Sequence, residues 1–356
     1  MKAKLSQRRG GGRRTVTMKQ VAELAGVHVS TVSRALNPAT RPMVVAEAVA
    51  RVMKAASTLG YRLDPVAASL RTGRSRLVGV LVPDIATSVF TPILTGATAR
   101  LSAHGYSAMV AYVGGDARQQ LDLAGDLIAR RVDGLILATV SLDDPLVGFC
   151  LAEKLPAVLV NRAEKEARVP AVVSDDMRGM QLAIDHLVAL GHSRIGHLAG
   201  PQQHSTGLLR RQGLLQALAS HGLKAHGLIE AGTYTREEGA QAARRLIEDH
   251  PEITAIVAAN DLLALGAYDA LREHGLTCPG DLAIIGHNDM PLVDLVQPPL
   301  TTIRISHEEM GRQAADLLQQ TIEAADSPVR NIVLPPRLIV RGSTAAPRKG
   351  RVKSKA

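Results

Sequence analysis

Residues 17–36 read T-M-K-Q-V-A-E-L-A-G-V-H-V-S-T-V-S-R-A-L, and this stretch predicts two short helices joined by a turn at Gly26. Thr17 is a suitable N-cap for the first helix, and Gln20 three residues later completes a capping box. The apolar contacts between the helices are expected from Val21, Leu24, Val27 and Val32. The second helix carries the hydrogen-bonding side chains Ser30, Thr31, Ser33 and Arg34. The pattern predicts a helix-turn-helix, whose second helix has the right size for a DNA major groove.

A third helical segment extends this motif into an all-α headpiece of residues 17–61. A third helix is predicted from about Val45 to Leu59, and it ends at Gly60. The headpiece follows residues 1–16, which are basic, Gly-rich and expected to be a disordered arm. Residues 62–75 are expected to form a linker, and residues 346–356 a second basic, disordered tail.

The net charge of +9 is divided unevenly along the chain. Residues 1–75 hold 14 Lys and Arg against 3 Asp and Glu, residues 76–345 hold 23 against 30, and residues 346–356 hold 5 against none. A basic N-terminal module is typical of a protein that binds a phosphate backbone. A polybasic membrane contact would give the same charge, but no amphipathic apolar helix accompanies it. Double-stranded DNA is therefore the predicted partner.

The chain changes character from Leu77 onward, where short apolar runs alternate with helical stretches. The runs are L-V-G-V-L-V-P, Y-S-A-M-V-A-Y-V, V-D-G-L-I-L-A, A-V-L-V, R-I-G-H-L-A-G, A-I-V-A-A-N and L-A-I-I-G. This βαβ order predicts parallel sheets with helices on both faces. Residues 76–345 are long enough for two such subdomains.

Several classes of function are disfavoured by what the sequence lacks. With no apolar N-terminal signal and no apolar run long enough to cross a bilayer, the chain is expected to be cytoplasmic and without membrane contact. Cys150 and Cys278 lack metal-ligand spacing, and neither a metal nor a cofactor is expected. No P-loop, H-E-x-x-H or G-x-S-x-G motif supports a sugar- or nucleotide-handling enzyme, so no catalytic residue is assigned. A pure solute-binding protein conflicts with the fused headpiece.

The motif V-A-x-x-A-G-V-x-x-x-T-V-S-R-x-L-N resembles the lactose/galactose repressor (LacI/GalR) family of bacterial transcription regulators. The resemblance extends from Thr17 to Thr344 and implies a periplasmic-binding-protein-like effector domain, residues 76–345, built from two parallel-sheet subdomains. It implies that the chain crosses between the subdomains three times, near residues 161–163, 288–292 and 324–328. It also implies a regulator, usually a repressor, that binds a near-palindromic operator as a homodimer and is controlled by a small-molecule effector. The C-terminus has no leucine heptad, so a dimer rather than a tetramer is expected.

The resemblance transfers to individual residues of the DNA-binding part. The headpiece residues that it implies are Thr17, His28, Val29, Ser30, Thr31, Ser33, Arg34 and Asn37. Residues 61–75, Y-R-L-D-P-V-A-A-S-L-R-T-G-R-S, resemble the family's hinge helix, in which Leu70 would wedge into the minor groove and Ala67 would face the dimer mate. The family usually has Ser where this chain has His28, so a weaker phosphate-contacting helix cap is expected.

The same transfer gives an effector site between the subdomains, at the carboxyl ends of parallel strands. Its candidate residues are Val89, Phe90, Asn161, His204, Thr206, Leu208, Asn260 and Asn288. Arg210 and Asp261 match positions that look structural.

The identity of two candidate residues bears on the ligand. Relatives often have carboxylates where this chain has Asn161 and Asn288, which removes the repulsion that would exclude an anion. With Arg162 and His204 nearby in sequence, an acidic ligand such as a sugar acid or organic acid is favoured. A neutral sugar is the alternative, although Phe90 is the only aromatic residue in these candidate loops.

Overall fold

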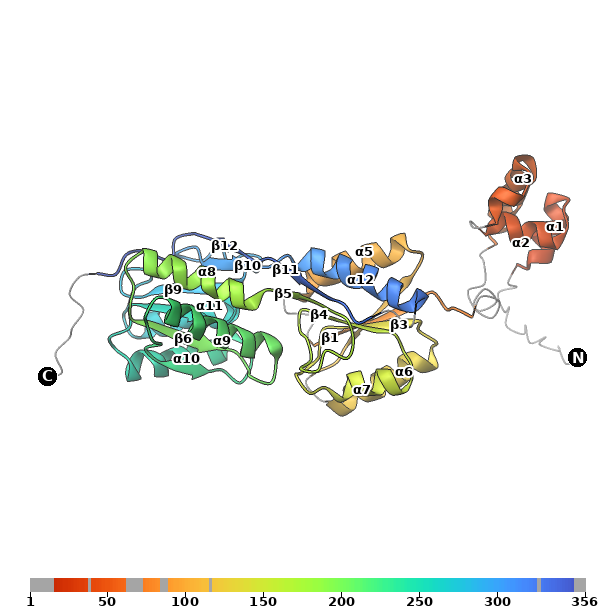
Figure 1. Ribbon diagram of the computed structural model, residues 1–356. Coiled ribbons are helices and arrows are strands. Elements are labelled where there is room, and N and C mark those ends of the chain that lie inside the picture. The colour runs from red at the N-terminus through yellow and green to blue at the C-terminus, as the bar shows by residue number, and fades with distance from the viewer. Residues whose placement is uncertain are drawn as a thin grey trace, which may run out of the picture. The chain divides into compact units, whose positions relative to one another are not determined.

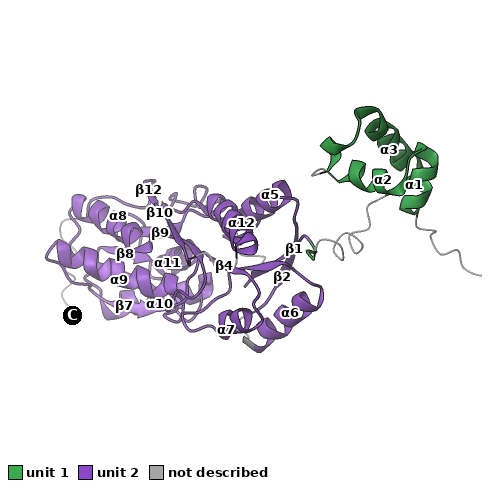
Figure 2. Ribbon diagram, turned by 45° about the vertical axis from the view of Figure 1, so that its right-hand side comes forward, with its two compact units in different colours: residues 1–75 green, residues 76–356 purple. Residues whose placement is uncertain are grey.

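The computed structural model describes residues 16–37, 40–61, 73–83, 89–114, 117–324 and 328–348. The chain divides into two compact units, residues 1–75 and residues 76–356 (Figure 2). The expected basic arm up to residue 15, most of the hinge segment with Ala67 and Leu70, and the tail from residue 349 lie outside the described residues.

The described residues of the first unit form three α-helices and a short 3-10 turn. Its elements are α1 (Met18–Ala25), α2 (Val29–Leu36), a 3-10 turn η1 (Arg41–Met43) and α3 (Ala46–Leu59). Gly26 and Gly60 end α1 and α3 with φ of 62° and 65°, a left-handed conformation that glycine adopts without strain. The core consists of Val21, Ala22, Ala25, Val32, Ala35, Val52, Ala55 and Ala56. The expectation for Leu24 is wrong, because the buried stripe of α1 runs along Val21, Ala22 and Ala25 and leaves Leu24 54% exposed.

The described residues of the second unit form two six-stranded sheets. The first sheet has the order β11-β5-β4-β3-β1-β2, and all its strands are parallel. Its strands are β1 (Leu77–Val82), β2 (Ser107–Tyr112), β3 (Gly134–Leu137), β4 (Ala157–Val160), β5 (Ala171–Ser174) and β11 (Asn331–Leu334). Its helices are α5 (Phe90–Ala103), α6 (Ala117–Ala129), α7 (Pro145–Ala152) and α12 (His307–Glu323).

Both faces of this sheet are covered, as Figure 1 shows with α5 and α12 on one side and α6 and α7 on the other. Side chains alternate along β1: Val78 and Val80 pack in the core under α5 and α12, whereas Leu81 packs with α6 and α7. Burial on both faces explains why the strands read as continuous apolar runs.

The second sheet has the order β12-β10-β9-β8-β6-β7 and is parallel except for β12, which is antiparallel to β10. Its strands are β6 (Ile195–Ala199), β7 (Leu228–Glu230), β8 (Ala255–Ala258), β9 (Ala283–Asn288), β10 (Thr301–Arg304) and β12 (Arg337–Ile339). One core joins it to α8 (Asp176–Ala189) and α9 (Ser205–Ser220), and the other joins it to α10 (Arg236–Asp249) and α11 (Asp261–Glu273).

The chain crosses between the two subdomains three times, but not at the expected positions. The crossings join β5 to α8 at residues 174–176, β10 to α12 at 304–307, and β11 to β12 at 334–337. The expectation of crossings near 161–163, 288–292 and 324–328 is therefore wrong. The error arose because the apolar runs of β5 (A-V-V) and β11 (I-V-L) are three residues long, shorter than those recognised as strands in the sequence.

Helices α5 and α12 pack against each other through glycines. A Cβ atom on Gly96 of α5 would collide with the backbone carbonyl of Glu308, and one on Gly311 of α12 would collide with that of Ile93. The two helix backbones therefore approach more closely than any other residue at these positions would allow.

Candidate functional site

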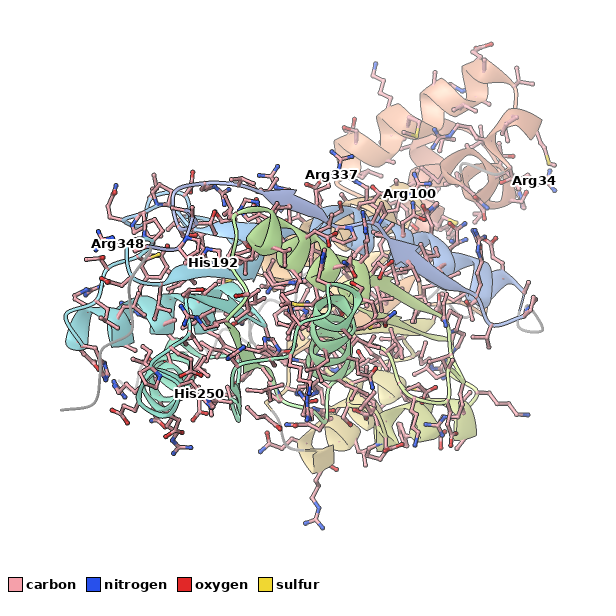
Figure 3. The ribbon with its side chains drawn as sticks, turned by 60° about the vertical axis from the view of Figure 1, so that its left-hand side comes forward. Arg34, Arg100, His192, His250, Arg337 and Arg348 are labelled. Atoms are coloured by element: carbon pink, nitrogen blue, oxygen red, sulfur yellow. The ribbon has the colours of Figure 1, made fainter. Side chains whose placement is uncertain are left out.

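The exposed face of α2 is the candidate DNA-reading surface. Val32 and Ala35 point into the core, and Val29, Ser30 and Arg34 lie exposed on the outside of the helix. Figure 3 labels Arg34 on this unit. The exposed residues thus combine an apolar group, a hydroxyl and a guanidinium on one side of a short helix.

A histidine caps the N-terminus of α2. His28 is its N-cap, and the Nδ1 atom accepts from the backbone N–H of Ser30 at 3.3 Å and lies 2.8 Å from the Ser30 hydroxyl. The ring therefore does the capping that a serine side chain does at other helices. The capping box of α1 is confirmed, since Thr17 accepts from the Gln20 N–H and the Gln20 side chain accepts from the Thr17 N–H.

The remaining predicted DNA-contacting residues lie on the same unit. Thr17 is exposed at the start of α1, Thr31 and Ser33 are half-buried on α2, and Asn37 is its half-buried C-cap. Ala67 and Leu70 lie outside the described residues, so the hinge remains a prediction.

A cavity of about 550 Å³ opens between the two subdomains of the second unit. Residues at or just after the carboxyl ends of β1 to β4 and β6 to β9 line it, which is where parallel sheets bind ligands. The lining from the first subdomain includes Pro83, Tyr112, Thr139 and Asn161, and the lining from the second includes Pro201, Thr233, Asn260 and Asn288.

The structure brings seven of the eight predicted effector residues together. Val89, Phe90, Asn161, His204, Thr206, Asn260 and Asn288 all line this cavity. Leu208, half-buried on α9, is not among the lining residues. It follows Thr206 by only two positions, and in a helix such neighbours face different directions.

Four buried polar atoms in the cavity wall have no hydrogen-bond partner among the described residues. They are Thr139 Oγ1, Arg162 Nε, His204 Nδ1 and Asn288 Oδ1. A buried polar atom without a partner costs free energy, so their concentration at one cavity is typical of a site that a polar ligand completes. Asn260 differs, because its side chain accepts from the Leu263 N–H and caps α11.

Arg162 is the most unusual of these residues. It is only 9% exposed, and the hydrogen bond found for it within the described residues runs from Nη1 to the carbonyl oxygen of Thr139 at 3.5 Å. Burial lowers the pKa of its guanidinium, and Asp144, the nearest acid in the wall, already accepts from the N–H groups of Ser141 and Leu146. The cavity therefore contains a desolvated cation whose donors point to no carboxylate of the described chain.

His204 adds a second polar group to the same wall. Burial, followed by the repulsion of Arg162, lowers the pKa of His204 to about 4. Its imidazole is therefore neutral near pH 7 and is available to a ligand as a hydrogen-bonding group rather than as a charge.

The cavity is joined to the first crossing by Arg210. This lining residue pairs with Asp176 at 2.8 Å and donates to the carbonyl oxygen of Ala259 at 2.6 Å. Asp176 follows directly on the crossing and also lies 3.5 Å from the buried ring of His287. The structural role expected of Arg210 is confirmed, as is that of Asp261, which accepts from Thr302 Oγ1 and from the Met290 N–H.

Sequence reasoning missed part of the lining. Phe90 is not the only aromatic side chain there, since Tyr112 and Tyr234 also line the cavity, and the Tyr234 hydroxyl lies 3.1 Å from Thr206 Oγ1. Tyr234 follows the three-residue strand β7, which gave no recognisable signal. Tyr112 ends a strand that was recognised, so a search of strand ends would have found it.

In the described residues, no cluster of three or more His, Cys, Asp or Glu side chains is arranged to hold a metal ion. Within the same part of the chain, no helix is both long enough and apolar enough to span a membrane.

Two family models match the chain. Residues 17–64 match the model for bacterial regulatory proteins of the lacI family, and residues 184–344 match a periplasmic binding protein-like domain.

The similarity to individual proteins extends over nearly the whole chain. The HTH-type transcriptional regulator MalR of Streptomyces coelicolor is 34% identical over 342 residues, which cover 93% of this chain and 97% of MalR. The structure of the Lac repressor dimer bound to operator and the anti-inducer ONPF has a TM-score of 0.82 at 29% identity, covering 94% of this chain and 100% of that one. A complex of the transcriptional regulator CelR with cellobiose has a TM-score of 0.72 at 30% identity, covering 92% and 99%.

Proposed function

The chain belongs to the lacI family of bacterial regulatory proteins, a non-enzymatic family, and we propose that it is a homodimeric repressor released or engaged by a sugar acid. As a member it is a DNA-binding transcriptional regulator with a sugar-like effector site. We further propose that the effector is an acid, that the residues described below contact the operator and the effector, and that the protein acts in the cytoplasm, where the chromosomal DNA is.

The headpiece supplies the DNA contacts in this proposal. Arg34, Ser30 and Val29 are exposed on α2 and offer, in turn, a bidentate donor, a hydroxyl and an apolar contact to base edges. One such helix touches too few bases for specificity, so two copies on a near-palindromic operator are required. Leu292 and Leu295, which are 68% and 69% exposed, provide apolar surface for a second copy.

The observation that carries the effector class is the buried guanidinium of Arg162, which has no carboxylate partner among the described residues. A ligand carboxylate would supply the charged acceptor that the described protein does not, and charge-assisted hydrogen bonds are about twice as strong as neutral ones. Asn161 and Asn288 keep two positions of the wall free of negative charge. Thr139, His204 and Tyr234 offer neutral donors and acceptors that suit sugar hydroxyls.

A neutral sugar is the second candidate. Tyr112 and Tyr234 add aromatic surface to Phe90, and the similar regulator CelR forms a complex with cellobiose. In that case a sugar hydroxyl would occupy the place of the carboxylate, and Arg162 would remain without a counter-charge.

The switch follows from the position of the cavity between the subdomains. A ligand that contacts both walls favours one arrangement of the pair over the other, which changes the operator affinity by the difference in binding free energy. Arg210 lines the cavity and pairs with Asp176 at the first crossing, so it connects the ligand site to this crossing between the subdomains.

A thermal-shift panel with full-length protein tests the effector class. D-gluconate and D-glucuronate are compared with D-glucose, and D-galacturonate with D-galactose, at equal concentration and ionic strength. D-ribose and cellobiose are added as further neutral sugars. The proposal requires stabilisation by at least one acid and not by its neutral counterpart, because a ligand stabilises the state that it binds. Stabilisation by neutral sugars alone would assign the cavity to them instead. Selection of genomic binding sites provides the separate test of the DNA-reading part.

A further inference from the structure

On the exposed face of α2, the hydroxyl of Ser30 contacts the imidazole ring of His28. Ser30 Oγ lies 2.8 Å from His28 Nδ1, and the backbone nitrogen of Ser30 lies 3.3 Å from the same ring atom. Both residues are exposed at the start of α2. The hydroxyl is thus held at the outer surface of the helix rather than left free to rotate.

The backbone contact determines which tautomer the ring adopts. A backbone N–H only donates, so His28 Nδ1 must present a lone pair to Ser30, and the ring proton must be on Nε2. The opposite tautomer would leave the Ser30 N–H without its cap and direct two N–H groups at each other. The N-cap geometry therefore favours the tautomer with the proton on Nε2.

The tautomer in turn determines what Ser30 offers to a partner. With Nδ1 as acceptor, the 2.8 Å contact requires that the Ser30 hydroxyl donates its one proton to the ring. Only the lone pairs of Ser30 Oγ remain. A serine hydroxyl is ordinarily an ambiguous base reader, since it donates or accepts as needed. Here the hydroxyl is an acceptor only.

We infer that Ser30 reads an exocyclic amino group of the operator, N6 of adenine or N4 of cytosine, and that His28 is the positioning residue for this specificity. Guanine and thymine present the acceptors O6 and O4 at the equivalent place in the major groove, and an acceptor-only hydroxyl cannot bond to them. The Nε2–H group of His28 stays available as a donor to a phosphate oxygen. The inference rests on the proposed placement of α2 in the major groove.

The test begins with selection from a random duplex library by the full-length protein and three variants. Ser30→Ala should lose the preference at one position of each half-site and keep the rest of the motif. His28→Ala frees the hydroxyl to donate, so the same position should accept all four bases. His28→Asn is the matched control, because the Asn side-chain oxygen caps the helix and accepts from Ser30. It should restore the original preference.

Base analogues then identify the group that is read at that position. In an A·T pair, purine in place of adenine deletes the amino group, and 5-methyl-2-pyrimidinone in place of thymine deletes O4. Deletion of the keto oxygen also removes the ring N–H and with it a second base-pair hydrogen bond. Each analogue duplex is therefore compared between the wild type and Ser30→Ala, for which the weakening of the duplex is the same. In a C·G pair, 2-pyrimidinone and 2-aminopurine serve in the same way. Amino deletion should weaken wild-type binding about two- to tenfold and leave Ser30→Ala unaffected.

The outcomes separate this inference from the proposed function. Sensitivity to deletion of the keto oxygen instead of the amino group overturns the inference, as does a Ser30→Ala motif identical to that of the wild type. In both cases a sequence-specific operator is still selected. Failure of the DNA-reading proposal gives a different result, namely no enriched half-site with any of the four proteins.

Discussion

Arg162 donates from Nη1 to the carbonyl oxygen of Thr139 across 3.5 Å, so within the described residues a buried cation in the cavity wall has one long hydrogen bond, to a neutral group. Arg168, six residues later, differs, since Glu164 pairs with it at 2.7 Å. The contrast supports the proposal that Arg162 binds a ligand.

Replacing Arg162 with Gln should lower the affinity for the acid that gives the largest thermal shift by about 10- to 100-fold, because a charge-assisted hydrogen bond contributes about 1.5–3 kcal/mol. The ligand-free protein should not lose stability, since a desolvated charge is removed. Isothermal titration and thermal melts measure the two effects. Arg168→Gln is the control and should keep the affinity. Equal loss in both variants would contradict the assignment.

Replacing Arg34 with Ala should weaken operator binding by about 1–3 kcal/mol, as expected for loss of a bidentate base contact. The side chain is exposed on α2, so the fold should be unaffected. Titration of a selected operator measures the change. Arg245→Ala, which removes an equal charge from an exposed position on α10, should leave the affinity unaltered. An Arg34→Ala protein with wild-type affinity would exclude this residue from the reading surface.

Deleting residues 2–14 removes six Lys and Arg and should flatten the salt dependence of DNA binding. Each phosphate contact contributes about 0.9 to the slope of log K against log salt, so the slope should fall by up to about five. Titrations at several salt concentrations give this slope. Removal of residues 349–356, which carry four basic side chains, shows whether any cationic segment has the same effect. An unchanged slope after the first deletion would refute a role for the arm.

The α5–α12 contact predicts opposite effects for two glycine substitutions. Gly96→Ala should destabilise the protein by about 1–3 kcal/mol, because the new methyl group collides with the backbone of Glu308. Gly125→Ala on α6 meets no described atom within 4 Å and should stabilise by up to about 1 kcal/mol through helix propensity. Urea denaturation at 25 °C gives both values. Similar effects of the two substitutions would argue against the close approach of α5 and α12.

Acidification should destabilise the protein through three buried histidines. Burial lowers the pKa to about 4 for His197 and His287 and to about 3 for His307. Below about pH 6.5 the unfolded chain binds protons on these rings that the folded chain does not, so unfolding is favoured as the pH falls. Burial raises the pKa of Asp261 to about 7, so below about pH 7 the folded chain binds one proton that the unfolded chain does not. This effect stabilises the folded protein on acidification and cancels the contribution of about one histidine.

His204, whose pKa is also lowered to about 4, adds one more proton to this difference. The free energy of unfolding should therefore fall by up to about 4 kcal/mol per pH unit between about pH 6 and pH 4.5. His307→Gln should reduce this slope by about one proton, or about 1.4 kcal/mol per pH unit. Urea titrations across the range measure it. A free energy of unfolding that stays constant or rises on acidification would show that these rings are protonated in the folded protein.

The parts of the fold that were predictable from sequence are those with periodicity or capping signals. The capping box at Thr17 and Gln20 and the apolar strands β1, β4 and β9 have such signals. Strand β5 has an apolar run of only three residues, so it was not recognised, and the first crossing was therefore misplaced.

The candidate site also has a part that was predictable from the sequence and a part that was not. Asn161 and Asn288 were assigned to the cavity by the family resemblance, and both follow or end strands that the apolar runs also predict. Two features of the site could not be predicted: Arg162 has no acidic partner among the described residues, and His28 caps α2 with its ring. Both depend on distances between atoms in the folded chain, which no local sequence pattern gives.

The strand β11 has a consequence for how the chain is made. Residues 331–334 pair with β5, and α12 covers the same sheet, although most of that sheet is encoded before residue 175. On the ribosome, the first subdomain must wait unfinished while some 150 further residues are synthesised, with the apolar face beneath α12 open to water. The second subdomain, encoded almost wholly within that interval, has all but one of its strands before the first can close.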